Sequence, residues 1–309
     1  MRPIIDPVDR DLLERELTEE KLLRKTNNGN NLLYVVTNQD SPNVMMEIGR
    51  LRELSFRVAG GGTGKEVDID RYDTMPSPYK QIIVWDPAEK EILGGYRYIL
   101  CSEPSDADGY SYLATARLFR FSKIFREEYM PHMIELGRSF VQPAYQSTNR
   151  KGKGIYAMDN LWDGLGAVWM KNPHIKYFFG KVTMYTTFHR EARDLILYFM
   201  KKYFDDKDNL VVPFEPLKIT TDQKLLDSIL CGTTYREDYK LLSQNVRARG
   251  ENIPPLINAY MNLSPTMKVF GTAMNYGFGD VEETAIMITV TDMYDEKIER
   301  HIKSYINLS

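Results

Sequence analysis

The strand-like segment 132–141 constrains the fold of this chain most strongly, because an acidic and a basic residue interrupt its apolar pattern. Side chains alternate between the two faces of a regular strand, so Glu135 and Arg138, three positions apart, would face opposite sides. Gly137 lies between them, and a glycine inside a strand pattern often marks a bulge, which inserts one extra residue. We therefore predict a bulge within 135–139 that puts both side chains on one face, bends the strand and frees backbone N–H groups.

The patterns around this segment predict a mixed order of helices and strands. Helices are expected over 10–25, 44–58, 155–171, 189–203 and 221–250, where apolar residues recur every three or four positions or polar residues favour a helix. Strands are expected over 32–37, 81–85, 92–99, 132–141, 182–187 and 286–290. This order predicts an α/β (α+β) fold with a mixed, mostly antiparallel central sheet that is flanked by helices and splays beside 135–141.

The length and charge of the chain narrow its class. Its 309 residues suit one large domain, which we predict over 31–309 with a helical elaboration around 205–260, preceded by a helical arm at 1–30. The net charge of −3 argues against a nucleic-acid partner held through phosphates. No apolar run approaches the roughly 20 residues of a membrane span, and the acidic N-terminus lacks the apolar region of a signal peptide. We therefore predict a cytoplasmic protein.

The cysteines and histidines do not indicate a metal site. Cys101 and Cys231 form neither a CxxC pair nor another metal-ligand spacing, so a disulfide scaffold is not expected either. His132, His174 and His301 also lack the spacing of metal ligands. We predict no bound metal.

Charged residues gather at three places on or beside the predicted strands. The acidic run 66–73 follows a glycine-rich loop, Arg97 lies in the strand 92–99, and Glu135 and Arg138 lie in the strand 132–141. A group of carboxylates and arginines can hold a cationic amine and its carboxylate, with arginine as the bidentate partner. Surface charge on turns is the alternative interpretation of the acidic run.

A basic loop with two glycines precedes the helix expected over 155–171. Arg150, Lys151 and Lys153 supply positive charge beside Gly152 and Gly154. Backbone amides at a helix N-terminus bind phosphate groups, so the loop favours a phosphopantetheine or pyrophosphate ligand, and an acidic carrier protein could dock beside it. A solvated turn is the alternative interpretation.

The order of these elements resembles the GNAT-related N-acyltransferases that make ornithine or glycine lipids, which are often called hemolysins and are distantly related to acyl-homoserine-lactone synthases. The resemblance covers most of 31–303, and ELGRSFVQPAY at 135–145 is its most specific motif. The other matches are Arg52 and Phe56 in RLRELSF, Asp70, Tyr72 and Asp73 in DIDRYD, Arg97 in GGYRYI, LW at 161–162 and IPPLINAYMNL at 253–263.

This resemblance implies a GNAT-like acyl-CoA N-acyltransferase fold. It also implies transfer of an acyl chain, usually 3-hydroxylated, from acyl carrier protein to the amino group of an amino acid, which makes a lyso-aminolipid. Glycine and ornithine both remain open as acceptors, and acyl carrier protein and acyl-CoA as donors, with no permanently bound cofactor. A lipid product leaves peripheral contact with a membrane open.

The resemblance assigns roles to individual residues. The catalytic residues would be Glu135 and Arg138, and the substrate-binding residues would be Arg52, Phe56, Asp70, Asp73 and Arg97. The donor-binding residues would be Ser139, Phe140, Arg150, Lys151, Gly152, Lys153 and Gly154. This chain has Asn149 where the usual phosphate loop has Gln or Arg, which leaves the form of the donor cradle open.

The chemistry of amine acylation makes its own demands on these residues. An attacking amine must be neutral, so a carboxylate or an ordered water must accept its proton, and Glu135 is the candidate base. A tyrosine such as Tyr198 is a candidate for protonating the thiolate that leaves.

Competing functions fit the sequence less well. The loop 59–65 misses the phosphate-binding P-loop pattern at Ala59 and Glu66, and we interpret it as a flexible loop that closes over the substrate. His189 and Asp194 spell the H-x4-D dyad of glycerolipid O-acyltransferases, but five positions apart on a helix they point about 140° away from each other. An autoinducer-type synthase is a second rival, although this chain is much longer than such enzymes need. A non-catalytic binding or membrane-lytic hemolysin-like protein is a third rival, and the absence of an apolar span argues against lysis by insertion.

Overall fold

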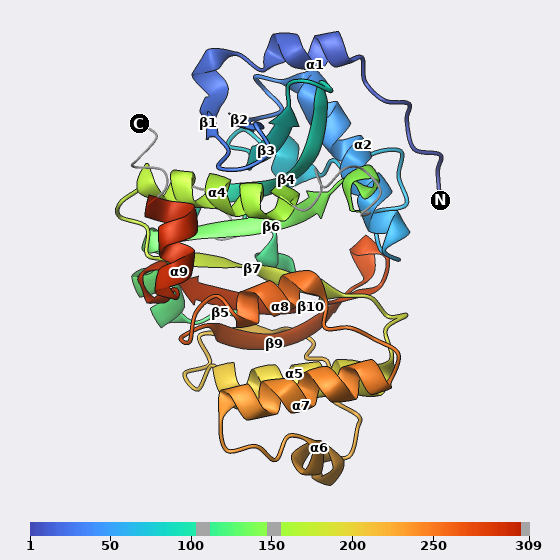
Figure 1. The fold of residues 1–309 in the computed structure, drawn as a ribbon, viewed down its shortest axis with the longest axis vertical. Helices are drawn as coiled ribbons and strands as arrows, with labels where there is room; N and C mark the ends of the chain where they lie inside the picture. Colours follow the sequence, from blue (N-terminus) through green and yellow to red (C-terminus); the bar gives the residue numbers. More distant parts are fainter. Residues whose placement is uncertain (103–111, 147–155, 304–309) are drawn as a thin grey trace. The chain divides into compact units, whose positions relative to one another are not determined.

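The computed structural model describes residues 1–102, 112–146 and 156–303, and the chain divides into two compact units (Figure 1). Unit 1 consists of Met1–Ala114, Met130–Lys176 and Tyr294–Ser309. Unit 2 consists of Thr115–Tyr129 and Tyr177–Met293. The predicted division into an arm at 1–30 and one domain over 31–309 stays a prediction, because compact units do not measure what folds independently.

Unit 1 is built on an antiparallel sheet. Its strands lie in the order β1 (Leu22–Lys25), β2 (Leu32–Val36), β3 (Lys80–Asp86), β4 (Glu91–Leu100) and β6 (Met133–Val141), each antiparallel to the next. Its helices are α1 (Arg10–Glu16), α2 (Pro42–Val58), α3 (Arg71–Thr74), α4 (Ala157–Met170) and α9 (Asp295–Ile298). Short connections join β1 to β2 and β3 to β4, as expected for antiparallel pairing. The helices α2 and α3 lie between β2 and β3, and a longer segment that contains β5 (Phe119–Phe121) lies between β4 and β6.

Unit 2 has a smaller antiparallel sheet with strands in the order β7 (Tyr177–Met184), β10 (Val281–Thr289) and β9 (Lys268–Asn275). A separate two-stranded ribbon pairs β5 (Phe119–Phe121) with β8 (Val211–Pro213). The helices of this unit are α5 (Arg190–Phe204), α6 (Gln223–Ile229), α7 (Tyr235–Ala248) and α8 (Pro255–Met261).

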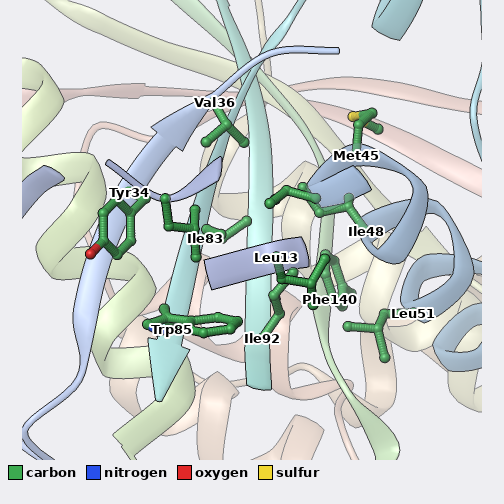
Figure 2. Close-up of a cluster of buried hydrophobic side chains, with 12 residues drawn as sticks. Leu13, Tyr34, Val36, Met45, Ile48, Leu51, Ile83, Trp85, Ile92 and Phe140 are labelled. Atoms are coloured by element: carbon green, nitrogen blue, oxygen red, sulfur yellow. The ribbon is translucent and has the colours of Figure 1, made fainter. Parts of the chain in front are cut away.

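The two faces of the unit 1 sheet are covered by different helices. Figure 2 shows a cluster in which α1 and α2 pack on β2, β3, β4 and β6. Its members are Leu13, Leu17, Tyr34, Val36, Val44, Met45, Ile48, Leu51, Ile83, Trp85, Ile92 and Phe140. A Cβ at Gly164 of α4 would meet Leu33 and Ile82, the residues that alternate with Tyr34 and Ile83. Since alternate strand residues face opposite sides, α4 covers the face away from α2.

The mixed α/β fold class with mostly antiparallel pairing is confirmed, and most predicted elements are present. Four expectations were wrong in extent, and one of them is the strand expected over 286–290, because β10 begins at Val281. The helix expected over 10–25 ends at Glu16, because Leu22–Lys25 instead pairs with β2 as an edge strand. The strand expected over 182–187 is β7, which begins at Tyr177, and the polar helix expected over 221–250 is broken into α6 and α7.

The strand β9 was missed altogether. Its alternation is interrupted at Gly271, which has a φ of 95°, and its pairing with β10 is irregular there. A strand with such an irregularity does not show the period of two on which strand prediction depends. The predicted splay of the sheet beside 135–141 stays a prediction.

No helix in the described part of the chain is long and apolar enough to cross a membrane.

Two adjacent leucines of α1 test whether this helix belongs to the core of unit 1. Leu13 is 2% exposed and lies in the cluster of Figure 2, whereas Leu12 is 37% exposed. We expect Leu13→Ala to lower the free energy of unfolding by about 2–5 kcal/mol, because it removes buried apolar contacts and leaves a cavity. Leu12→Ala is the matched control and should change it by less than about 0.5 kcal/mol. Chemical denaturation measures both, and equal small effects would contradict the packing of α1 on the sheet.

Candidate active site

The predicted bulge in the strand 132–141 is confirmed, at Arg138 and Ser139 of β6. Gly95 of β4 is paired with Phe140, and Arg97 is paired with Gly137, so two steps along β4 match three steps along β6. Arg138 has a φ of 50°, in the left-handed region that L-residues avoid. Gly137 itself is paired regularly, so the expectation that the glycine marks the bulge was wrong in this detail.

A buried carboxylate holds Arg138 in this strained conformation. Its Nε donates to Oδ2 of Asp68 at 2.7 Å and its Nη2 donates to Oδ1 at 3.3 Å, a bidentate pair. Asp68 is fully buried, and Arg138 Nη2 also lies 3.6 Å from Oδ2 of Asp70. A left-handed L-residue costs roughly 1–2 kcal/mol, so the ion pair offsets the strain of the bulge.

Two further arginines meet the acidic run from α2 and β4. Arg97 Nη1 lies 2.9 Å from both carboxylate oxygens of Asp70 and 3.3 Å from Oδ2 of Asp73. Arg52 Nη1 lies 3.2 Å from both oxygens of Asp73, and its Nη2 donates to Oε1 of Gln81 at 2.5 Å. Gln81 Nε2 donates in turn to Asp73 at 3.0 Å. The structure therefore joins the predicted substrate-binding residues other than Phe56 into one network.

The spacing of Asp70 and Asp73 has a local cause. Asp70 is the N-cap of α3, where its side chain accepts from the Tyr72 N–H at 2.9 Å. The side chain of Asp73 accepts from the Asp70 N–H at 3.0 Å, which completes a capping box. The short helix α3 thus aims both carboxylates at the arginines.

The charges of this network balance. Three arginines, Arg52, Arg97 and Arg138, lie in ion pairs with three aspartates, Asp68, Asp70 and Asp73. Burial by itself raises the pKa of Asp73, but Arg52 and Arg97 outweigh it and hold the pKa well below the ordinary value. Burial lowers the pKa of Arg52, whereas the aspartates around Arg97 raise the pKa of that guanidinium in spite of its burial. Asp73 and Arg97 are therefore charged near neutral pH.

Glu135 lies in a separate hydrogen-bonded group on the same face of the sheet. Its Oε1 accepts from the hydroxyl of Tyr79 at 2.6 Å and from the Ala114 N–H at 3.0 Å, and both side chains are buried. The guanidinium of Arg97 lies 5.0 Å from the ring centre of Tyr79, which links this group to the arginine network. The register puts Glu135 on the side of Arg97, and Arg138 joins Arg97 through Asp70.

The remaining predicted site residues have different surroundings. The side chain of Phe140 is a member of the buried cluster of Figure 2, Phe56 packs against that cluster, and Ser139 is partly exposed at the bulge. Asn149, Arg150, Lys151, Gly152, Lys153 and Gly154 lie outside the described residues. The donor-binding roles of Ser139, Phe140 and 150–154 and the substrate-binding role of Phe56 stay predictions.

Sequence reasoning missed two members of the site and undervalued a third. Tyr79 and Gln81 lie two positions apart at the start of β3, so they share a face with each other and with Arg97. The alternation of side chains along the strand could have predicted this shared face, but neither Tyr79 nor Gln81 carries a charge, so neither was considered. Asp68 was noticed as part of the acidic run, yet only the fold reveals that it pairs with Arg138, 70 positions away.

The glycine-rich loop 59–65 is anchored to α2. The carboxylate of Glu53 is buried and accepts from the Thr63 N–H at 3.0 Å, from the Thr63 hydroxyl at 2.7 Å and from the Gly64 N–H at 2.8 Å. These bonds give Glu53 a structural role. Closure of the loop over a substrate stays a prediction.

The rival H-x4-D dyad does not form. His189 is the N-cap of α5 and is exposed, whereas Asp194 is fully buried and its Oδ2 accepts from the backbone N–H groups of Thr220 and Thr221. The hydroxyl of Tyr198, the candidate general acid, donates to Asp227. Within the described residues no group of His, Cys, Asp and Glu side chains could hold a metal ion.

Comparison with known proteins gives close relatives. The chain is 57% identical over 307 residues to a glycine N(alpha)-acyltransferase of Phocaeicola vulgatus, covering 99% of this chain and 94% of that protein. It is also 57% identical to a glycine N(alpha)-acyltransferase of Bacteroides thetaiotaomicron, covering 99% of this chain and 91% of the relative. A family model described as acetyltransferase (GNAT) domain matches residues 51–152, which include Arg52, Glu135 and Arg138.

Solved structures are more distant. The N-acyl amino acid synthase FeeM from uncultured soil microbes has 10% identity and a TM-score of 0.40, over 89% of this chain and 96% of FeeM. The AHL synthase LasI has 11% identity and a TM-score of 0.37, over 84% of this chain and 91% of LasI. At these scores the structural similarities carry no argument about function.

Substitution of Arg138 by glycine and by alanine separates the effect of backbone strain at the bulge from the effect of losing the ion pair. Both variants lose the contact with Asp68, but glycine adopts the left-handed conformation readily and alanine does not. We expect Arg138→Gly to have a free energy of unfolding about 1 kcal/mol higher than Arg138→Ala. Arg126 is exposed and its φ is not positive, so it serves as the control. There the glycine variant should have a free energy of unfolding equal to or lower than that of the alanine variant. Urea denaturation measures all four variants, and equal stability of the two Arg138 variants would contradict the strained bulge.

The depressed pKa of Asp73 predicts a loss of stability in acid. An unfolded chain binds a proton at Asp73 near the ordinary pKa of about 3.9, whereas the folded chain does not, so the stabilisation is complete above that pH and is lost below it. We expect the free energy of unfolding to fall as the pH drops below about 4, and Asp73→Asn to fall less steeply. Urea titrations at several pH values measure both slopes, and parallel slopes would contradict the prediction.

Proposed function

The chain belongs to the family of GNAT-like glycine N(alpha)-acyltransferases, and we propose that it transfers a 3-hydroxy fatty acyl group from acyl carrier protein to the amino group of glycine. The product would be a lyso-aminolipid. The observation that carries the proposal is the 57% identity over 99% of the chain to two proteins named for glycine N-acylation. That the chain is an acyltransferase follows directly from the same relationship.

The reaction makes one bond and breaks one. The neutral amine of glycine attacks the carbonyl carbon of the thioester, a C–N bond forms, and the C–S bond breaks as the tetrahedral intermediate collapses. A base first takes one proton from the glycine ammonium and passes it to solvent. A second proton leaves the nitrogen on collapse and ends on the thiolate, so that N-acylglycine and the free carrier thiol are the products.

The exposed edge of the arginine network is where the acceptor would bind. The side chains of Arg138 and Asp70 are 14% and 23% exposed, whereas those of Arg52, Asp68 and Asp73 are fully buried. Arg138 can hold the carboxylate of glycine and Asp70 can attract its ammonium group. The other members hold these two in place.

The charge balance of the network favours glycine over ornithine. Ornithine carries a second ammonium group, which would need a further carboxylate. Each of the three aspartates already lies in an ion pair with an arginine. A second positive charge beside Arg97 and Arg138 would be repelled, so an acceptor without a cationic side chain fits better.

Glu135 is the proposed base that receives the ammonium proton. It is a buried carboxylate on the face that carries Arg97, and Tyr79, which donates to it, lies against the guanidinium of Arg97. The donor would be held at the bulge by Ser139 and the backbone of Phe140, and by Arg150, Lys151, Gly152, Lys153 and Gly154 around its phosphate. The basic loop and an acidic carrier protein are complementary in charge, which supports acyl carrier protein over acyl-CoA.

The enzyme would act in the cytoplasm without a permanent cofactor, since its donor brings the phosphopantetheine thioester. Its product carries a long acyl chain, so release at a membrane surface is expected, with peripheral contact only.

Purified protein incubated with 3-hydroxyacyl carrier protein and single amino acids tests the proposal. We expect N-acylglycine by mass spectrometry and free carrier thiol in equal amounts, and far less product with ornithine or with acyl-CoA as donor. Glu135→Gln and Arg138→Ala should each lower kcat/KM about 100-fold. The exposed matched controls Glu127→Gln and Arg126→Ala should leave it unchanged.

Several results would count against the proposal. If no amino acid is acylated, the function is wrong. If ornithine is preferred, the acceptor is wrong. If Glu135→Ala combined with Arg138→Ala keeps full activity, the assigned site is wrong although the function stands.

A further inference from the structure

We propose that Tyr79 is a positioning residue that holds Glu135 as a correctly oriented carboxylate, an inference that rests on the role of Glu135 in the proposed function. Tyr79 precedes β3 and was not part of any expected motif. Its side chain is fully buried, and its hydroxyl donates to Oε1 of Glu135 at 2.6 Å. A hydrogen bond this short to a carboxylate belongs to the strong, charge-assisted class.

The backbone N–H of Ala114 is a third member of the hydrogen-bonded group that Tyr79 and Glu135 form. Its N–H lies 2.9 Å from the hydroxyl oxygen of Tyr79 and 3.0 Å from Oε1 of Glu135. Oε1 thus accepts two hydrogen bonds, one from a side chain and one from the backbone. Two donors at one oxygen fix the plane of the carboxylate as well as its position.

Tyr79 is itself held from several sides. Its N–H donates to the Tyr72 carbonyl at 2.9 Å, and its carbonyl accepts from Gln81 Nε2 at 3.1 Å. Its ring meets the ring of Tyr72 edge-on, with centres 5.8 Å apart, and lies under the guanidinium of Arg97. The ring therefore cannot turn away without disturbing residues of the arginine network, so the hydroxyl is a pre-organised donor.

The direction of the hydrogen bond is also settled. Burial, together with the neighbouring charge of Glu135, raises the pKa of Tyr79 well above 10, so the hydroxyl keeps its proton throughout the working range of an enzyme. Glu135 must then accept. The ionised form of a carboxylate gains more from such a donor than the neutral form does. Tyr79 therefore favours the form of Glu135 that can take a proton from the substrate.

The titratable groups in contact with this pair include Arg97 from β4, which lies over the ring of Tyr79, and Tyr72 from α3, whose ring meets it edge-on. The hydroxyl that Tyr79→Phe removes donates to Glu135, so a shift of the acidic limb that this substitution causes is assigned to Glu135.

Tyr79→Phe removes the hydroxyl and keeps the ring. We expect kcat/KM for glycine to fall about tenfold at neutral pH. The acidic limb of the kcat/KM profile should also move to higher pH, because the carboxylate loses a stabilising donor. Tyr203→Phe is the matched control, since Tyr203 donates to Asp238 at 2.7 Å in unit 2, and it should leave the pH profile unchanged. An unshifted acidic limb in Tyr79→Phe would overturn the proposal.

A double-mutant cycle separates positioning from general damage to the fold. If Tyr79 acts through Glu135, then Tyr79→Phe combined with Glu135→Gln should lose no more activity than Glu135→Gln by itself. Losses that multiply would show an independent structural effect and overturn the role of Tyr79, while the proposed function stands. Full activity of Glu135→Gln would instead overturn the site of the proposed function, and lack of any N-acylglycine would overturn the function itself.

Discussion

The ion pair between Arg138 and Asp68 is the interaction on which the rest of this site depends. It connects the bulge of β6 to the segment that leads into α3, and it stabilises a left-handed residue that would otherwise be strained. Because Asp68 is fully buried, removing either partner would leave an uncompensated charge inside the protein. The bulge, the direction of Arg138 and the position of the acidic run are therefore set together.

The other charges of the network are arranged for placement more than for stability. Buried ion pairs gain little net free energy because desolvation offsets the Coulomb attraction. Within the described part of the chain, Nε of Arg52 and Nε of Arg97 have no hydrogen-bond partner, which adds to the cost. A chain folds with such a cluster when neighbouring apolar contacts, here those of Figure 2 beneath α2, supply the stability. An arrangement that breaks local rules in this way is typical of a functional site.

Glu135 illustrates how a site joins separate parts of a chain. Its hydrogen-bond partners are Tyr79, the residue before β3, and the backbone of Ala114. Arg97 of β4 lies over the ring of Tyr79 and so connects this group to the arginine network. Acid, tyrosine and arginine therefore share one face of the unit 1 sheet, opposite to α4. Under the proposed function, this face would supply both Glu135 as the base and an arginine that binds the carboxylate of the acceptor.

Local patterns predicted much of this protein. Helical periodicity located α2, α4 and α5, alternation located β3 and β4, and the Glu135-x-x-Arg138 spacing predicted a bulge that the register of β4 and β6 confirms. Such features depend on residues close together in the chain, whose geometry local sterics and hydrogen bonding decide. The motif residues Arg52, Asp70, Asp73 and Arg97 were also found from the sequence.

The tertiary structure alone decided which of these residues meet. The pairing of Arg138 with Asp68 in place of Glu135, the hydroxyl of Tyr79 on Glu135, and the edge strand β1 in place of a longer helix all come from contacts between distant segments. Even the left-handed residue proved to be an arginine and not the adjacent glycine, since leaving the buried charge of Asp68 unpaired would cost more than a backbone strain of roughly 1–2 kcal/mol. A sequence determines local preferences of that size, and long-range burial and charge pairing, which are larger, select among them.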